Sequence, residues 1–192
     1  ASCSPLYGPG HVAIGLGEVK VRGSLPGIPE TRELLPTPYF HVVFTLPEEL
    51  GPLALHNPRI VCGLLFRSAS ESLLQIAADP KHLGARIGFL AVLHTWGQTL
   101  DLHPHVHCVV PGGGLSSDRR SWVRARPRFF LPVRVLSRIF RGKFLENLQT
   151  AYQKGQLRFP VAQETLRDPL RWKAFLKTLR RHEWVVYSKP PC

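Results

Sequence analysis

Three histidines, His103, His105 and His107, alternate along one short segment and are the residues of this sequence best suited to chemistry. Successive side chains of a β-strand point to opposite faces, so His105 and His107 would project side by side from a strand. Two imidazoles on one rigid face form a ready pair of ligands for a divalent metal. The spacing therefore indicates a metal site, but taken alone it is equally compatible with core histidines that make ordinary hydrogen bonds.

A third metal ligand would have to come from a neighbouring element. His94 ends the apolar run before the histidine pair, and a hairpin would fold it back toward that pair. Gln98 is a second candidate through its side-chain oxygen. His103 shares the strand face of the pair, but Pro104 would interrupt regular strand pairing there. We rank His94 first, Gln98 second and His103 third.

The elements that would hold these histidines are two apolar runs joined by a polar connection. Residues 105–110 have the β-branched character of a short strand, and the proline and glycines of residues 111–114 end it. Residues 87–94 fit a strand or a helix by pattern, but the short connection favours an antiparallel pair of strands. The glycines of residues 111–114 could approach a phosphate closely or form a plain turn.

The remaining patterns predict a mixed α+β domain with a partly antiparallel sheet. Asn57 before Pro58 is typical of a helix start, with Asn57 as the N-cap. Residues 1–37 are rich in glycine and proline and indicate irregular structure. The predicted helices are residues 57–78, 132–153 and 168–181, and the further predicted strands are residues 39–45, 121–123 and 183–187.

The net positive charge comes entirely from the second half of the sequence. The formal net charge is +12, and residues 101–192 carry all of it, because basic and acidic residues cancel in residues 1–100. A one-sided excess indicates a polyanionic partner, although a solvated basic face would have the same composition. The sequence shows no secretory signal and no long uncharged apolar run. Its four cysteines form no C-x-x-C pair and are typical of reduced thiols in a cytosol.

A cluster of arginines in this basic half is interleaved with Trp122, Phe129 and Phe130. Arginines contact phosphates while aromatic rings stack on unpaired bases, which is the usual chemistry of single-strand binding. The alternative is an exposed β-hairpin with a soluble face and a buried tryptophan. The predicted DNA-binding residues are Arg119, Arg120, Arg124, Arg126 and Arg128.

Three longer segments, LLPTPYFHVVFTLPEEL, LAVLHTWGQTLDLHPHVHCVVPGGGL and EWVVYSKPP, resemble the two-tyrosine HUH transposases of bacterial insertion sequences that move by rolling-circle replication. The resemblance runs from about Glu33 to Pro191. It implies an HUH-endonuclease palm, which is a central, largely antiparallel sheet flanked by helices. In that family the histidine-hydrophobic-histidine motif, here His105-Val106-His107, holds Mg²⁺ or Mn²⁺. His94 lies where the related relaxases of conjugation have a third histidine.

The resemblance also implies a reaction and its partners. The metal polarises the scissile phosphate of single-stranded DNA, and a tyrosine attacks it to form a phosphotyrosyl bond. The expected partner is DNA, as single-stranded transposon ends, with no membrane and no small-molecule cofactor. The expected location is the bacterial cytoplasm, in association with the nucleoid.

Two features of the sequence depart from the family pattern. The family's nucleophiles are a Tyr-x-x-x-Tyr pair beyond the position where this chain ends, and no two of its four tyrosines have that spacing. Tyr187 is interpreted as a packing residue of a strand. We therefore expect no catalytic residue here and take residues 33–192 as a fragment of the catalytic domain that lacks the tyrosine-bearing part. Residues 1–32 contain only Cys3 where the family has a cysteine-rich zinc module, and are expected to be an irregular segment unlike the family.

Two alternatives to a metal-binding transposase fragment follow from these departures. One is an inactive DNA-binding remnant or regulator that acts through charge alone. The other is the unfolded product of a disrupted gene, in which core surface would be exposed. Metal affinity that depends on His105 and His107 would distinguish the first hypothesis from the DNA-binding remnant. Low solubility or molten behaviour would support the unfolded product.

Overall fold

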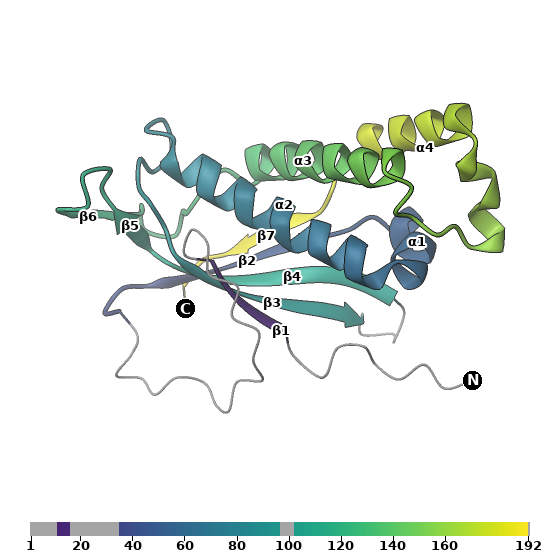
Figure 1. Cartoon of the computed structure of the whole chain (residues 1–192). Helices are drawn as coiled ribbons and strands as arrows, with labels where there is room; N and C mark the ends of the chain where they lie inside the picture. The colour runs from purple at the N-terminus through teal and green to yellow at the C-terminus, as the bar shows by residue number, and fades with distance from the viewer. Residues whose placement is uncertain (1–10, 16–34, 97–101, 192) are drawn as a thin grey trace.

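A five-stranded antiparallel sheet is the centre of the computed structural model, which describes residues 11–15, 35–96 and 102–191. Its strands lie in the order β1-β3-β4-β2-β7, so that β4, with the alternating histidines, is central (Figure 1). Each neighbouring pair is antiparallel. The strands are β1 (His11–Gly15), β2 (Tyr39–Thr45), β3 (Phe89–Trp96), β4 (Leu102–Pro111) and β7 (Val186–Lys189).

The two faces of this sheet differ in chemistry because side chains alternate along each strand. Phe44 of β2 and Val106 of β4 point to one face and are fully buried. The residues between such positions, His41 of β2 and His105 and His107 of β4, point to the other face, which we call the histidine face. The sheet thus uses one side for the core and leaves polar, titratable groups on the other.

Helices cover the core side of the sheet, where α2 and α3 lie across the strands (Figure 1). The ring of Phe140 on α3 meets Phe44 of β2 at 5.0 Å between centroids and Trp184 at 5.4 Å, both edge to face. Such aromatic contacts add to the free energy gained from apolar burial. The helices are α1 (Gly51–His56), α2 (Pro58–Ala78), α3 (Val133–Gln153) and α4 (Pro169–Arg181), with 3₁₀ segments η2 (Glu48–Leu50) and η3 (Val161–Arg167).

The helix starts agree only in part with the sequence prediction. Asp168 caps α4, since its side chain accepts hydrogen bonds from the backbone N–H groups of Leu170 and Arg171. Asn57 precedes α2 as predicted, but its side chain makes no cap hydrogen bond. It donates instead to the carbonyl of Arg158, 2.7 Å away, and accepts from the backbone N–H of the same residue. The side chain therefore joins α2 to a distant loop, which no local pattern could reveal.

A short hairpin of β5 (Gly113–Leu115) and β6 (Trp122–Arg124) extends from the end of β4. Its glycines are required by close approach to other parts of the protein. A Cβ at Gly114 would lie 2.5 Å from the carbonyl oxygen of Arg86, and a Cβ at Gly113 would lie 2.6 Å from the indole nitrogen of Trp122. Protein groups therefore fill the space beside both glycines.

Three sequence predictions need correction or resolution. Residues 87–94, ambiguous by pattern, form a strand, because β3 pairs with β1 on one side and β4 on the other. The prediction of irregular structure is wrong for residues 11–15, which form β1 and pair with β3. The run is too short to show a detectable hydrophobic period. The last strand begins at Val186 instead of residue 183, because Trp184 is buried in the core and donates to the carbonyl of Leu179.

By length and composition, α2 is the one helix among the described residues that could cross a membrane. Half of its most apolar window is buried inside the protein. Its buried residues include Leu65 and Leu73, both without exposed surface, which belong to the main core. Packing against the sheet and α3 accounts for the apolar character of this helix.

Candidate metal centre

The β3–β4 hairpin brings three histidines together on the histidine face. His94 of β3 is paired with His105 of β4, and His107 follows two residues further along β4. One ligand atom from each imidazole lies within 4.8 Å of the other two. The strand register therefore brings the predicted pair, His105 and His107, together with His94, the first-ranked candidate for the third ligand. We call these three residues the histidine cluster.

Hydrogen bonding fixes the tautomer of His105. Its Nδ1 lies 2.6 Å from the backbone carbonyl oxygen of His103. A carbonyl only accepts, so Nδ1 carries the proton and donates. In the neutral ring the lone pair then remains on Nε2, the atom available to a metal.

His107 is held by a fourth histidine, His41 of β2. Its Nδ1 lies 2.7 Å from Nε2 of His41, and the two rings are stacked with centroids 4.9 Å apart. The Nε2 of His107 is buried and has no hydrogen-bond partner among the described residues. A buried polar atom without a partner is costly. A metal ion would satisfy it in the tautomer in which Nδ1–H of His107 donates to His41.

Burial and mutual repulsion favour the neutral forms of His105 and His107. Burial is the main cause that lowers the pKa of His107 to about 4, and the neighbouring His94, His105 and His41 lower it further. Burial also lowers the pKa of His105, which its hydrogen bond to His103 partly offsets. Neutral imidazole is the form that ligates a metal, so the lowered pKa values of His105 and His107 favour metal binding at neutral pH.

The donor set fits a divalent ion with open coordination positions. The described residues supply three imidazoles, of which His94 is exposed while His105 and His107 are partly buried. Three protein ligands that leave a position open are typical of catalytic metal sites, whereas structural sites are closed. Because His94 is the exposed member, a water or a substrate oxygen could reach a bound ion from the side of His94.

The two lower-ranked candidates for the third ligand have different outcomes. Gln98 lies outside the described residues. His103 is on the same strand, with its ring centroid 5.8 Å from that of His105, but it is not a member of the three-residue cluster. Its contribution is the backbone carbonyl that orients His105. The predicted interruption at Pro104 is seen as a register shift between His94 and Trp96, and β4 itself continues through the proline.

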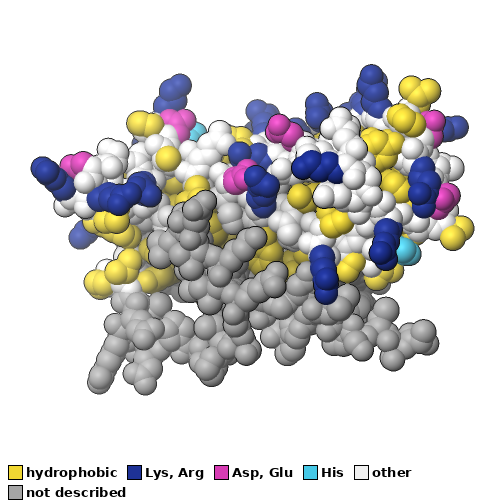
Figure 2. Space-filling model, in the orientation of Figure 1, with side chains coloured by type: hydrophobic (Ala, Val, Ile, Leu, Met, Phe, Trp, Pro, Cys, Tyr) yellow, Lys and Arg dark blue, Asp and Glu magenta, His cyan; other side chains and the backbone are white. Residues whose placement is uncertain are grey.

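The five arginines of the predicted DNA-binding group lie on and after the β5–β6 hairpin, and all are exposed. Arg119 and Arg120 are at its tip, Arg124 ends β6, and Arg126 and Arg128 lie in the following turn. Dark blue side chains stand out at this end of the molecule in Figure 2. Trp122 is not buried, since 39% of it is exposed. The exposed hairpin of the alternative interpretation is therefore present, but its buried tryptophan is wrong.

Sequence reasoning missed two features of the histidine face. His41 stands between apolar residues of β2, and this polar interruption was its only signal. Tyr187, interpreted as a packing residue, is 55% exposed, because β7 is an edge strand. It lies opposite Val43, which in turn lies opposite His107, so these residues point to the same face.

Fold and site together define an α+β domain whose central antiparallel strand carries a histidine cluster suited to a metal ion. The chain belongs to the transposase family described as "Putative transposase", whose family model matches residues 88–192. That stretch contains the whole histidine cluster and the β5–β6 hairpin. The match confirms the transposase resemblance of the sequence.

Two transposases support this membership. "Putative transposase y4qJ" of Sinorhizobium fredii (strain NBRC 101917 / NGR234) is 57% identical over 159 residues, which cover 83% of this chain and 40% of that protein. "Transposase for insertion sequence element IS801" of Pseudomonas savastanoi pv. phaseolicola is 44% identical over 81 residues, 42% of this chain and 19% of that protein. The chain therefore spans less than half the length of either relative.

Solved structures of the conjugative relaxase TrwC show weaker similarity. Its metal-bound complex with OriT DNA is 17% identical, with a TM-score of 0.45, over 57% of this chain and 42% of the relaxase chain. Its complex with mutant OriT DNA has a TM-score of 0.46 over 77% of this chain and 54% of the relaxase chain.

Proposed function

We propose that this chain supplies the metal-binding face of a transposase that nicks single-stranded DNA at transposon ends in the bacterial cytoplasm. The observation that carries the proposal is the histidine cluster, with ligand atoms within 4.8 Å of one another and a buried Nε2 on His107 that no described residue hydrogen-bonds. The family supports DNA as the partner, and we propose that the protein meets this DNA at the nucleoid.

In this proposal His94, His105 and His107 hold a divalent ion, Mg²⁺ or Mn²⁺. When bound, the ion supplies Lewis-acid polarisation of the scissile phosphate. The carbonyl of His103 and the ring of His41 orient the two β4 imidazoles, as outer partners of metal ligands commonly do.

The exposed arginines of the β5–β6 region would hold the DNA backbone. Arg119, Arg120, Arg124, Arg126 and Arg128 are free to contact phosphates, and contacts of this kind position a strand without reading its sequence. The same excess of positive charge would speed the encounter with DNA.

The described tyrosines are poor candidates for the attacking nucleophile. The hydroxyl of Tyr152 donates to the carbonyl of Arg167, and its ring stacks on Trp172 in the helical layer. The hydroxyl of Tyr39 accepts from the backbone N–H of Leu35. Tyr187 shares the histidine face but is separated from His107 by Val43 of the intervening strand. We propose that the whole transposase supplies the nucleophile from residues outside this chain.

Isothermal titration calorimetry with Mn²⁺ tests the metal site. We expect the double variant His105→Ala, His107→Ala to lose Mn²⁺ binding, because two of the three imidazoles disappear. His82→Ala is a matched control, since His82 is exposed in a turn after α2 and should leave binding unchanged. Equal Mn²⁺ affinity in the double variant and the wild type would refute the site and leave charge-driven DNA binding as the better hypothesis.

A further inference from the structure

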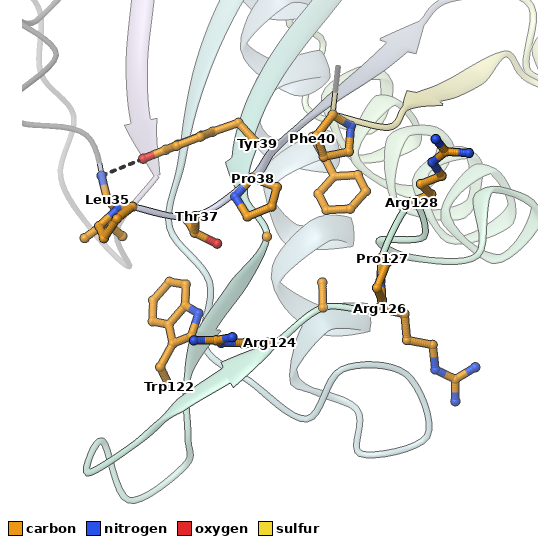
Figure 3. Close-up of a pocket in the computed structure, with 14 residues that line it drawn as sticks. Leu35, Thr37, Pro38, Tyr39, Phe40, Trp122, Arg124, Arg126, Pro127 and Arg128 are labelled. Atoms are coloured by element: carbon orange, nitrogen blue, oxygen red, sulfur yellow. Dashed lines mark hydrogen bonds between the residues drawn. The ribbon is translucent and has the colours of Figure 1, made fainter.

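A pocket beside the start of β2 is separate from the histidine cluster, because none of the three cluster histidines lines it. Its volume is about 990 Å³, at the upper end of ordinary ligand pockets. β2 and the loop before it form one wall, and β6 with the turn after it forms the other (Figure 3). The lining combines prolines and aromatic rings with three arginines, Arg124, Arg126 and Arg128, and the described lining contains no acidic side chain.

Trp122 gives the pocket a flat aromatic surface. Its indole lies against Gly113, where any Cβ would come within 2.6 Å of the ring nitrogen, so the backbone supports the ring from one side. The residue nevertheless keeps 39% of its surface exposed. A supported but exposed indole is a suitable platform for an unpaired base, since stacking needs one free aromatic face.

Arginines surround this platform. Arg124 is on the same face of β6 as Trp122 and lies beside it in Figure 3, whereas Arg126 and Arg128 extend outward from the rim. Arg128 has a positive φ of 58°, a left-handed conformation that costs less for glycine. It follows Pro127 in a turn closed by a 3.1 Å hydrogen bond from Phe129 N–H to the Arg126 carbonyl. An arginine at a position that favours glycine points to a use for its side chain.

The pocket is within reach of a strand bound at the histidine cluster. Tyr39 lines the pocket, and His41 and Val43 follow it on the same face of β2, with Val43 opposite His107. Four residues of antiparallel strand span about 14 Å. A stacked DNA strand covers that distance in about four nucleotides at about 3.4 Å each, and an extended strand in fewer.

We propose that this pocket binds an unpaired nucleotide of the DNA strand whose phosphate lies at the histidine cluster, with the base on Trp122 and the flanking phosphates on the arginine rim. The inference rests on the proposed single-stranded DNA substrate. Charge complementarity selects a polyanion, and the aromatic platform selects one with unpaired bases over a duplex, whose bases are not free to stack.

Fluorescence anisotropy of a labelled oligodeoxythymidine, with the full chain in EDTA, tests the proposal without the metal. Trp122→Ala is expected to weaken binding roughly 5- to 150-fold, the range for loss of one base stack. Trp122→Phe should retain most of the affinity, and Leu170→Ala, at an exposed apolar residue of α4, should retain all of it. Arg124→Gln should weaken binding and reduce its salt dependence more than Arg171→Gln on α4.

An abasic oligonucleotide of the same length keeps the proposal testable if a variant fails to fold. The wild type should bind it more weakly than oligodeoxythymidine, and Trp122→Ala should bind both alike. Equal affinity of the wild type for the two strands would overturn base binding. Base binding would also be overturned if Trp122→Ala weakened binding of a DNA duplex as much as it weakened binding of oligodeoxythymidine. A wild type that binds no oligonucleotide would overturn the proposed DNA substrate itself, whereas loss of Mn²⁺ binding alone would leave the pocket proposal standing.

Discussion

The Nε2 atom of His41 lies 2.7 Å from the Nδ1 atom of His107, across the β2–β4 strand pair. Because Nε2 of His107 is buried and has no partner in the described part of the chain, the arrangement suits a metal only if His107 donates its Nδ1 proton and His41 accepts it. His41 is thus a positioning residue in the proposed site. Burial, followed by the charge of Lys189, lowers its pKa and favours the neutral, accepting ring.

Removal of this acceptor should weaken metal binding. We expect His41→Ala to lower Mn²⁺ affinity about 10- to 100-fold in calorimetry, the usual effect of losing an outer partner of a metal ligand. His41→Asp and His41→Gln, which retain an acceptor oxygen, should recover part of the affinity. His103→Ala should bind normally, because His105 uses only the backbone carbonyl of His103. Equal affinity of His41→Ala and the wild type would contradict the positioning role.

The histidine cluster should prefer Mn²⁺ to Mg²⁺. All three ligand atoms that the described residues offer are imidazole nitrogens, whereas Mg²⁺ prefers oxygen ligands and holds its waters firmly. Competition calorimetry should therefore show that excess Mg²⁺ fails to displace Mn²⁺. Displacement at equal concentrations would indicate that oxygen ligands, such as the side chain of Gln98, complete the site.

The stability of the metal-free chain should fall in mild acid. The pKa of His107 is about 4 in the folded chain, below its ordinary value of 6.5. Between these pH values the unfolded chain binds more protons at this residue, so the free energy of unfolding decreases as the pH is lowered through that window. Urea unfolding in EDTA at neutral pH and at pH about 5 measures the effect. His107→Ala should show a smaller pH dependence, and an unchanged dependence would assign the effect to other groups.

Local patterns were sufficient to predict the β3–β4 hairpin, the α2 and α3 helices and the grouping of His94 with the β4 histidines. The apolar periods that define these elements lie within short segments. The role of His41 could not be predicted, because it depends on a contact between residues 66 positions apart in the sequence. Similarly, the exposure of Tyr187 follows from the place of β7 at the edge of the sheet, which its own sequence does not specify.

Two glycine substitutions should have opposite effects on stability. Gly113 has a φ of 156°, and a Cβ there would meet the indole of Trp122. Gly113→Ala should therefore lower the melting temperature and, by displacing the indole, weaken oligonucleotide binding. Gly142 lies within α3, and a Cβ there would meet nothing within 4 Å. Gly142→Ala should stabilise the chain by about 1 kcal/mol in urea unfolding. A stabilised Gly113→Ala variant would contradict the close packing of the hairpin.

Tyr187 offers a direct test of where the nucleophile resides. The exposed ring of Tyr187 lies on the same face as the histidine cluster, but Val43 of β2 lies between Tyr187 and His107. The proposal therefore assigns Tyr187 no covalent role. Incubation of the chain with Mn²⁺ and single-stranded DNA should yield no protein–DNA adduct in denaturing gels or mass spectra. Tyr187→Phe should bind Mn²⁺ and oligodeoxythymidine like the wild type, because it removes only a hydroxyl. An adduct formed by the wild type and absent from Tyr187→Phe would instead make Tyr187 the nucleophile and give this chain a complete nicking site.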